Sequence, residues 1–100
     1  MDKYFIIFGY DGTDSEAPAR RAAAREAHLE SVKPLKAAGI YKYAGPLLDA
    51  DGNIKASMMV LKYPSEEVIR TEFLPNEPYY TQGVWERIEI VPHKPADAFL

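Results

Sequence analysis

The chain has 100 residues, which is the size of a single small domain. Hydrophobic residues make up 47% and charged residues 27% of the sequence, a composition that supports a packed core and excludes a disordered chain. The absence of cysteine excludes disulfide frameworks, thiolate metal sites and cysteine nucleophiles, and the net charge of −3 argues against a nucleic-acid partner.

The apolar segments of the chain are short. The longest one near the start covers residues 4–8, which is shorter than the core of a signal peptide. No segment approaches the ~20 apolar residues that a membrane span needs. We therefore expect one domain over residues 1–100, located in the cytoplasm and without a membrane partner.

The first predicted elements are a strand and a long helix. Residues 4–8 form a continuous apolar run ended by Gly9, a pattern typical of a central strand covered on both faces. The alanine-rich residues 17–38 have high helix propensity, and Gly39 is suited to the left-handed turn that ends a helix.

Two local signals bear on the ends of this helix. Thr13 and Glu16 have the spacing of a capping box and mark its start. Pro34 lies inside the helical pattern, where it removes a backbone hydrogen bond and crowds the preceding turn. We expect a kink or an early end of the helix near Lys33.

Two strands are predicted next. The first covers residues 40–45, and alternation places Tyr41 and Tyr43 on the same face of it. The second covers residues 55–63 and follows a turn that contains an Asp-Gly pair.

The last two predicted elements are a short helix and a strand. Ser65 can cap the helix, and Pro75 prevents its continuation. Residues 84–91 alternate as in a strand, which Pro92 closes.

The resulting order is β-α-β-β-α-β, which predicts an α+β fold of the ferredoxin-like type. Right-handed crossovers place both helices on one face of a four-stranded antiparallel sheet. Seven tyrosines and Trp85 are more aromatic side chains than two helices can cover, so some of them are expected on the open face. We predict a homodimer formed through the sheets.

One stripe of the long helix combines apolar and titratable side chains. At ~100° per residue, a single stripe contains Arg21, Arg25, His28, Val32 and Leu35. A helix that only buries this face would carry aliphatic residues where Arg25 and His28 stand. His28 is therefore a candidate acid–base residue; a half-buried structural histidine bonded to a backbone carbonyl is the alternative.

A second candidate lies in the segment before the last strand. Pro75 and Pro78 bracket Glu77, and the residue before a proline is restricted to extended geometry, which gives this carboxylate a fixed direction. A rigid loop with an acid and aromatic residues is typical of functional sites. The alternative is a helix-ending turn with a solvated acid.

A set of short motifs is spread in order over nearly the whole chain. It comprises Arg25, Glu26, Ala27, His28, Leu29, Gly39, Ala44, Gly45, Pro46, Leu47, Ser57, Glu77, Pro78, Tyr79, Gly83 and Val84. These motifs resemble the YciI-like (YCII-related) family, which has Arg-x-x-His-Leu, Ala-Gly-Pro, Gly-Ser and Asp-Pro-Tyr in this order. At two positions the chain differs: Glu77 replaces the aspartate and changes its reach, and Ala56 replaces the glycine and narrows the space beside it.

The resemblance implies a fold that dimerises through its sheets, as in the dimeric α/β-barrel superfamily, and a His–acid pair in a cleft. His28 and Glu77 occupy the family's catalytic positions, and Arg25, Ser57 and Tyr79 occupy positions that line the site. Characterised activity in the family includes dehydrochlorination of a chlorinated hydroxyquinone.

These features predict an isomerase or lyase that moves protons on small cyclic oxo or hydroxy compounds. A carboxylate bonded to one imidazole nitrogen leaves the other nitrogen as a base, and Arg25 one turn away can hold an enolate or carboxylate. The alternative is a non-catalytic dimeric module that binds a small molecule or has a structural role.

Metal sites need clustered donors, and His28 and His93 show no ligand spacing. We therefore expect no metal and no other cofactor, a small-molecule ligand and a second copy of the chain as partners, and no nucleic acid.

Overall fold

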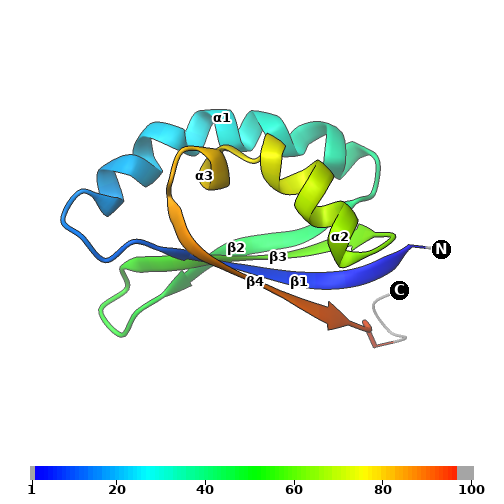
Figure 1. Ribbon diagram of the computed structural model, residues 1–100. Helices are drawn as coiled ribbons and strands as arrows, with labels where there is room; N and C mark the ends of the chain where they lie inside the picture. Colours follow the sequence, from blue (N-terminus) through cyan, green and yellow to red (C-terminus); the bar gives the residue numbers. More distant parts are fainter. Residues whose placement is uncertain (1, 97–100) are drawn as a thin grey trace.

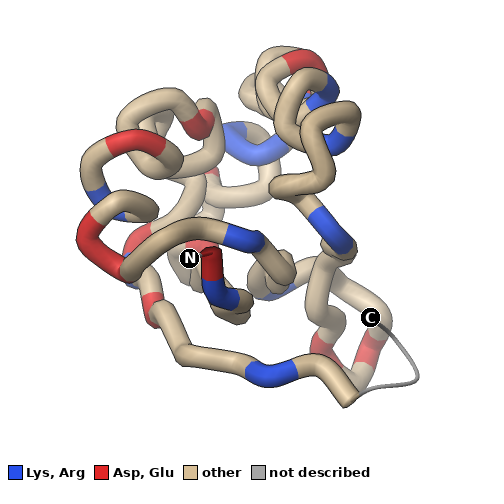
Figure 2. Tube along the Cα trace, turned by 90° about the vertical axis from the view of Figure 1, so that its right-hand side faces the viewer, with Lys and Arg blue, Asp and Glu red and all other residues tan. Residues whose placement is uncertain are grey.

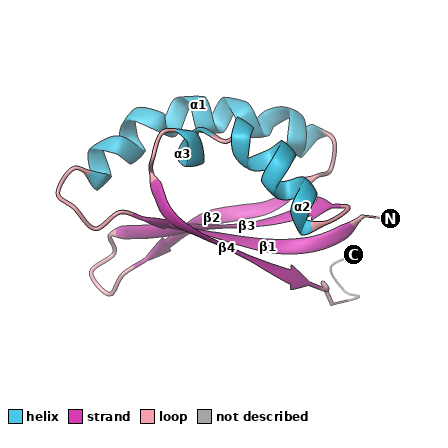
Figure 3. Cartoon of the chain, in the orientation of Figure 1, coloured by secondary structure: helices cyan, strands magenta, loops and turns pink. Residues whose placement is uncertain are grey.

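Four antiparallel strands and a layer of helices make up the structure. The computed structural model describes residues 2–96. Its elements in chain order are β1 (Lys3–Asp11), α1 (Ala17–Ala37), β2 (Tyr41–Leu48), β3 (Ile54–Tyr63), α2 (Glu66–Val68), the π-helical η1 (Ile69–Phe73), the 3₁₀-helical η2 (Leu74–Asn76), α3 (Pro78–Thr81) and β4 (Trp85–His93). The strand order is β2-β3-β1-β4, and the helices lie on one face of the sheet (Figures 1 and 3). The predicted ferredoxin-like α+β fold is confirmed.

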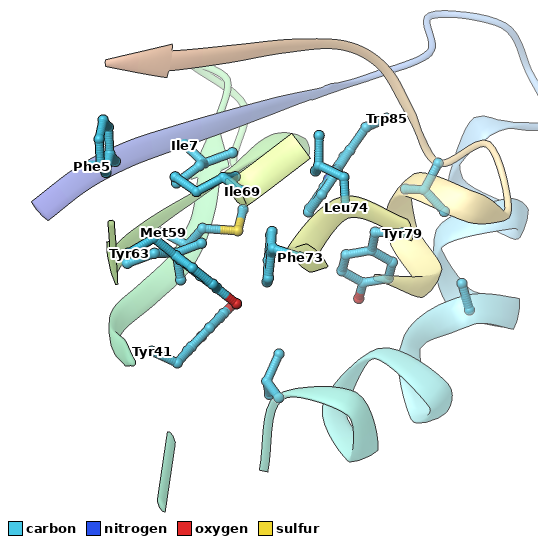
Figure 4. Packing of buried hydrophobic residues seen from close by; sticks show 14 residues of the cluster. Phe5, Ile7, Tyr41, Met59, Tyr63, Ile69, Phe73, Leu74, Tyr79 and Trp85 are labelled. Carbon is cyan, nitrogen blue, oxygen red and sulfur yellow. The ribbon is translucent and has the colours of Figure 1, made fainter. Parts of the chain in front are cut away.

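The core lies between the sheet and the helices. On β1, Phe5 and Ile7 point toward the helices, and their partners on β3 are Leu61 and Met59, all of them buried. Figure 4 shows these side chains packed against residues of η1 and η2. Their alternation with half-buried neighbours is why β1 reads as a continuous apolar run.

The other face of the sheet is apolar along its centre. Ile6 of β1 lies between Val60 of β3 and Val91 of β4, and all three are half-buried although no helix lies over this face. Strand β2 adds Tyr43, which is 67% exposed. Aromatic and aliphatic side chains therefore line the open face, as predicted.

The pairing of β2 differs from the simple alternation that we expected. The register with β3 shifts between Tyr41 and Tyr43, which is the sign of a bulge. As a result Tyr41 is buried in the core whereas Tyr43 is exposed. The extra residue at the bulge moves the side chains that follow it to the opposite face of the sheet, up to the second register shift between Leu47 and Leu48.

Helix α1 begins and continues differently from the prediction. Thr13 and Glu16 form no capping box; instead Asp14 Oδ2 accepts a hydrogen bond from the backbone N–H of Glu16. The helix runs through Pro34 to Ala37, so the early end near residue 33 is wrong. Packing of Val32 before the proline and of Leu35 after it against the core stabilises the helix on both sides of Pro34.

The segment after β3 contains more helix than expected. Ser65 caps α2 by accepting a hydrogen bond from the N–H of Val68, as predicted. The chain continues through η1 and η2 past Pro75 and then forms α3, where only a loop was expected. This short helix lies between α1 and the start of β4 in Figure 1 and places residues 77–79 against α1.

Gly9 allows two strands and an aromatic ring to meet. Strand β1 continues past it to Asp11, and a Cβ at this position would overlap the indole ring of Trp85. The glycine therefore does not end the strand as predicted; it makes room for Trp85 at the beginning of β4.

Charged residues of both signs are interspersed along the trace (Figure 2).

Among the helices of residues 2–96, none has the length and apolarity to span a bilayer.

Candidate functional site

The site is centred on a contact between α1 and the start of α3. The Nδ1 atom of His28 lies 2.6 Å from Oε1 of Glu77. Glu77 is the N-cap of α3, because the same oxygen accepts the N–H of Tyr79 at 3.0 Å, and its side chain is only 1% exposed. The prolines on either side and this cap hold the carboxylate in one direction.

The contact defines the chemistry of the imidazole. An ionised carboxylate only accepts hydrogen bonds, so beside such a carboxylate a neutral imidazole would carry its proton on Nδ1 and its lone pair on Nε2. Oε2 of Glu77 is buried and has no hydrogen-bond partner within residues 2–96. Among the described residues, His28 and the backbone N–H of Tyr79 are the groups that compensate the negative charge of the carboxylate through Oε1.

Tyr79 holds the plane of the histidine ring. The two rings stack with centroids 4.0 Å apart and planes inclined by 10°. Tyr79 is in turn fixed by Trp85, whose ring meets it edge-on, and by the guanidinium of Arg21, 4.7 Å from its centroid. Figure 4 shows Tyr79 beside Trp85 at one end of the core.

Ser57 is oriented by two donors. Its Oγ accepts hydrogen bonds from Arg21 Nη2 at 2.7 Å and from Trp85 Nε1 at 3.3 Å. A hydroxyl has two acceptor positions and one proton, so with both acceptor positions occupied the proton is available to a ligand. Arg21 is itself held by Asp11, whose two carboxylate oxygens accept at 2.7 and 2.9 Å.

A cavity of about 290 Å³ brings these groups together. Its walls come from α1, β2, β3 and α3, and it is lined by Arg21, Arg25, His28, Leu29, Tyr41, Ala44, Gly45, Pro46, Ile54, Ser57, Met58 and Tyr79. We call it the His28 cavity. Its lining combines polar groups with aliphatic ones, which is typical of small-molecule sites.

Two groups at the cavity keep their protons. Burial raises the pKa of Tyr41, and the negative charge of Glu77 raises it further, so the phenol stays neutral. Burial opposes the charge of Arg21, but its hydrogen bonds with Asp11 outweigh this effect and raise its pKa.

The structure brings together the residues that the sequence singled out. His28, Ser57, Tyr79 and Arg25 line the cavity, and Glu77 bonds to His28 directly, so the additional methylene is accommodated. Ala56 is fully buried and does not line the cavity, so the narrowing expected there does not occur.

Sequence reasoning missed the part played by three residues. Arg21 was considered only as a member of the helical stripe and Trp85 only as one of the excess aromatic residues, and no part was assigned to Asp11. The helical spacing of Arg21 relative to His28 was the available signal. Its pairing with Asp11 depends on β1 extending past Gly9, which the sequence pattern did not show.

A protein-family model, the YCII-related domain, matches residues 3–94. The chain belongs to this family.

Within residues 2–96 no cluster of three or more His, Cys, Asp or Glu side chains gathers as a metal site would require.

Solved structures share the fold of this YCII-related protein. They include 5-chloro-2-hydroxyhydroquinone dehydrochlorinase (TftG) of Burkholderia phenoliruptrix in complex with 2,5-dihydroxybenzoquinone, with a TM-score of 0.79, 23% identity, and 95% of this chain and 97% of that chain covered. A NIPSNAP family protein of Agrobacterium tumefaciens has a TM-score of 0.56 at 13% identity, covering 97% and 95% of the two chains. Rv0793 of Mycobacterium tuberculosis has a TM-score of 0.53 at 18% identity, covering 97% of each. A search of the curated proteins found no match.

Proposed function

We propose that this protein is a cofactor-independent isomerase or lyase that moves protons on small cyclic oxo or hydroxy compounds. The observation that carries the proposal is the 2.6 Å contact between His28 Nδ1 and the buried carboxylate of Glu77 at the wall of a cavity. A carboxylate that orients an imidazole is the arrangement by which enzymes make histidine a general base.

In this proposal His28 removes a proton from the ligand. The ring is half-buried and stacked on Tyr79, so Nε2 has a fixed direction, while Glu77 holds the proton on Nδ1 and stabilises the imidazolium that forms. The proton then returns to a different atom in an isomerisation, or a leaving group departs in an elimination.

Ser57 binds the oxygen side of the ligand, and Arg25 favours a ligand that carries a negative charge. The proton of the Ser57 hydroxyl is free to donate to a carbonyl oxygen that gains charge as the enolate forms. Arg25 lines the same cavity and adds a positive charge.

The size of the cavity supports a single-ring ligand. About 290 Å³ is at the lower end of the range for small-molecule sites. The dehydrochlorinase with the same fold was crystallised with 2,5-dihydroxybenzoquinone, a ligand of this size and chemistry. We therefore include chlorinated hydroxyquinones among the candidate substrates.

The apolar open face of the sheet supports the proposal of a homodimer. Ile6, Val60 and Val91 form its centre, and a second copy of the same face is a self-complementary cover for it.

Hydrogen–deuterium exchange at carbon tests the proposed proton transfer without knowledge of the final product. The protein is incubated in D₂O with a panel of cyclic ketones, lactones and chlorinated hydroxyquinones, and NMR follows exchange, isomerisation and chloride release. We expect at least one compound to react, with the rate falling by roughly a hundredfold or more in His28→Ala. His93→Ala, which removes the exposed histidine of β4, is the matched control and keeps the full rate.

The non-catalytic alternative makes the opposite prediction. If panel compounds bind in the His28 cavity but none reacts, or if His28→Ala reacts as fast as the wild type, the assignment of His28 as base is wrong and the protein is a binding module.

A further inference from the structure

A second cavity adjoins the His28 cavity along helix α1. It has a volume of about 580 Å³ and lies between the first turns of α1, the residues that follow β1, and the turn before β3. The two cavities share three lining residues, Arg21, Arg25 and Ile54. A ligand in the His28 cavity can therefore extend past these residues into the second one.

The charges around the second cavity leave one group uncompensated. Arg21 is held by both oxygens of Asp11, and Asp14 is held by Arg20 at 2.6 and 2.9 Å. Arg25 has no ion pair within residues 2–96, although it lines both cavities. A free guanidinium at the junction favours an anionic group on the ligand.

The spacing along α1 places this anion away from the reacting ring. Arg25 lies three residues before His28, about 4.5 Å along the helix axis, and Pro18 at the far wall lies about 15 Å from His28. The second cavity is also lined by small apolar side chains such as Ala17 and Ala22, which suit an aliphatic segment.

We propose that the natural ligand carries an aliphatic substituent ending in a carboxylate, that this substituent occupies the second cavity, and that Arg25 binds the carboxylate. The inference rests on the proposed function and narrows its substrate class from cyclic compounds in general to those with an acidic side chain. The guanidinium of one arginine binds a carboxylate with two parallel hydrogen bonds, and the single uncompensated positive charge of Arg25 balances a monoanionic carboxylate rather than a dianionic phosphate.

Two probes of the same size test the proposal by binding alone. They are 3-(4-hydroxyphenyl)propionate and its uncharged amide, titrated by calorimetry and by NMR of the labelled protein. We expect the acid to bind at least about tenfold more tightly than the amide. Both probes shift the ring signals of His28 and Tyr79, and the acid also shifts the amide signals of Asn53 and Ile54 in the second cavity. The analogous phosphate ester is a third arm, and it is expected to bind less tightly than the acid, because the one positive charge of Arg25 leaves part of its charge uncompensated.

Two pairs of variants locate the effect. Arg25→Gln removes the preference for the acid, whereas Arg70→Gln, which removes the same charge from an exposed ion pair on η1, preserves it. Ala22→Leu fills the second cavity and also removes the preference, whereas Ala23→Leu, its exposed neighbour on α1 that does not line the cavity, has no effect.

The outcomes distinguish this inference from the proposed function. If acid and amide bind equally beside His28 and Arg25→Gln changes neither, the inference is overturned while the proposed function stands. A preference for the phosphate ester overturns the choice of carboxylate. If neither probe, nor any cyclic compound of the exchange panel, shifts the signals of His28 or Tyr79, both proposals fail.

Discussion

At the scale of single residues, the site depends on side chains that are each held by two polar partners. Glu77 serves as helix cap and as partner of His28 with the same oxygen, and Ser57 receives two donors. Such over-determined side chains keep their directions without a ligand, which is the condition for electrostatic stabilisation of a transition state.

Ser57→Ala tests whether its hydroxyl acts on the developing oxyanion. We expect the rate constant of the exchange reaction at saturating ligand to fall by about a hundredfold with little change in KM, because the donor is needed most in the transition state. Steady-state NMR kinetics measures both. Ser31→Ala is the control, because that hydroxyl bonds to the carbonyl of His28 outside the cavity. An increase in KM at an unchanged rate constant would show that Ser57 only binds the ground state.

The site was predictable to the extent that it follows helical spacing and local motifs. The stripe on α1 placed Arg21, Arg25 and His28 on one face, and the prolines indicated a fixed direction for Glu77. Ser57 contacts Arg21, which lies 36 positions away in the sequence, and Trp85, which lies 28 positions away. No local pattern reports contacts of this kind.

At the scale of elements, β1 and β4 are joined at the site through Gly9. Its backbone lies directly against the indole of Trp85, and its partner across the ladder to β3 is Ser57. Any side chain at Gly9 therefore displaces the ring that donates to Ser57.

Gly9→Ala is expected to lower the free energy of unfolding by roughly 1–3 kcal/mol, as overpacking of a core does. It is also expected to change the fluorescence emission of Trp85 and to slow the exchange reaction. Denaturant titration followed by tryptophan fluorescence measures the first two effects. Gly45→Ala is the control for stability, since a Cβ there meets nothing within 4 Å. Unchanged stability and emission in Gly9→Ala would contradict the packing described for β1 and β4.

The start of α1 gives a prediction for acid pH. The guanidinium of Arg20 holds the pKa of Asp14 at about 2, below the ordinary value of 3.8 for this carboxyl. A lowered pKa in the folded state means that the ionised carboxylate stabilises the fold above pH 3.8, and that this contribution is lost as the pH falls toward 2. NMR titration is expected to show the pKa of Asp14 returning toward 3.8 in Arg20→Gln. A value near 3.8 already in the wild type would contradict the ion pair.

The elements themselves were largely predictable, and the exceptions have physical reasons. Apolar patterning showed all four strands and α1, because each has one face in the core. The continuation of α1 through Pro34 and the bulge at Tyr41 depend on tertiary packing that overrides local preference. Helix α3 is a single turn, and its cap, Glu77, was considered only as a candidate acid.

At the scale of the whole molecule, the proposed homodimer depends on the open sheet face. Ile6 lies at its centre, between strands β3 and β4, and is half-buried with no helix over it. The apolar area around it is of the kind that soluble proteins cover by association.

We predict a dimer by sedimentation velocity, and a monomer for Ile6→Asp. A charge at the centre of an apolar interface costs several kcal/mol when it is buried without a partner. Tyr80→Asp is the control, since Tyr80 is exposed on α3 on the opposite side of the sheet, and this variant is expected to stay dimeric. A monomeric wild type at all concentrations would contradict the homodimer.

In the proposed mechanism Glu77 holds the proton of His28 on Nδ1 and leaves Nε2 as the base. The most direct test is ¹⁵N NMR of the imidazole at a pH at which the ring is neutral, in the wild type and in Glu77→Gln. We expect a protonated Nδ1 and an unprotonated Nε2 in the wild type, and a loss of this preference in Glu77→Gln. A neutral ring protonated on Nε2 in the wild type, unchanged in Glu77→Gln, would contradict it.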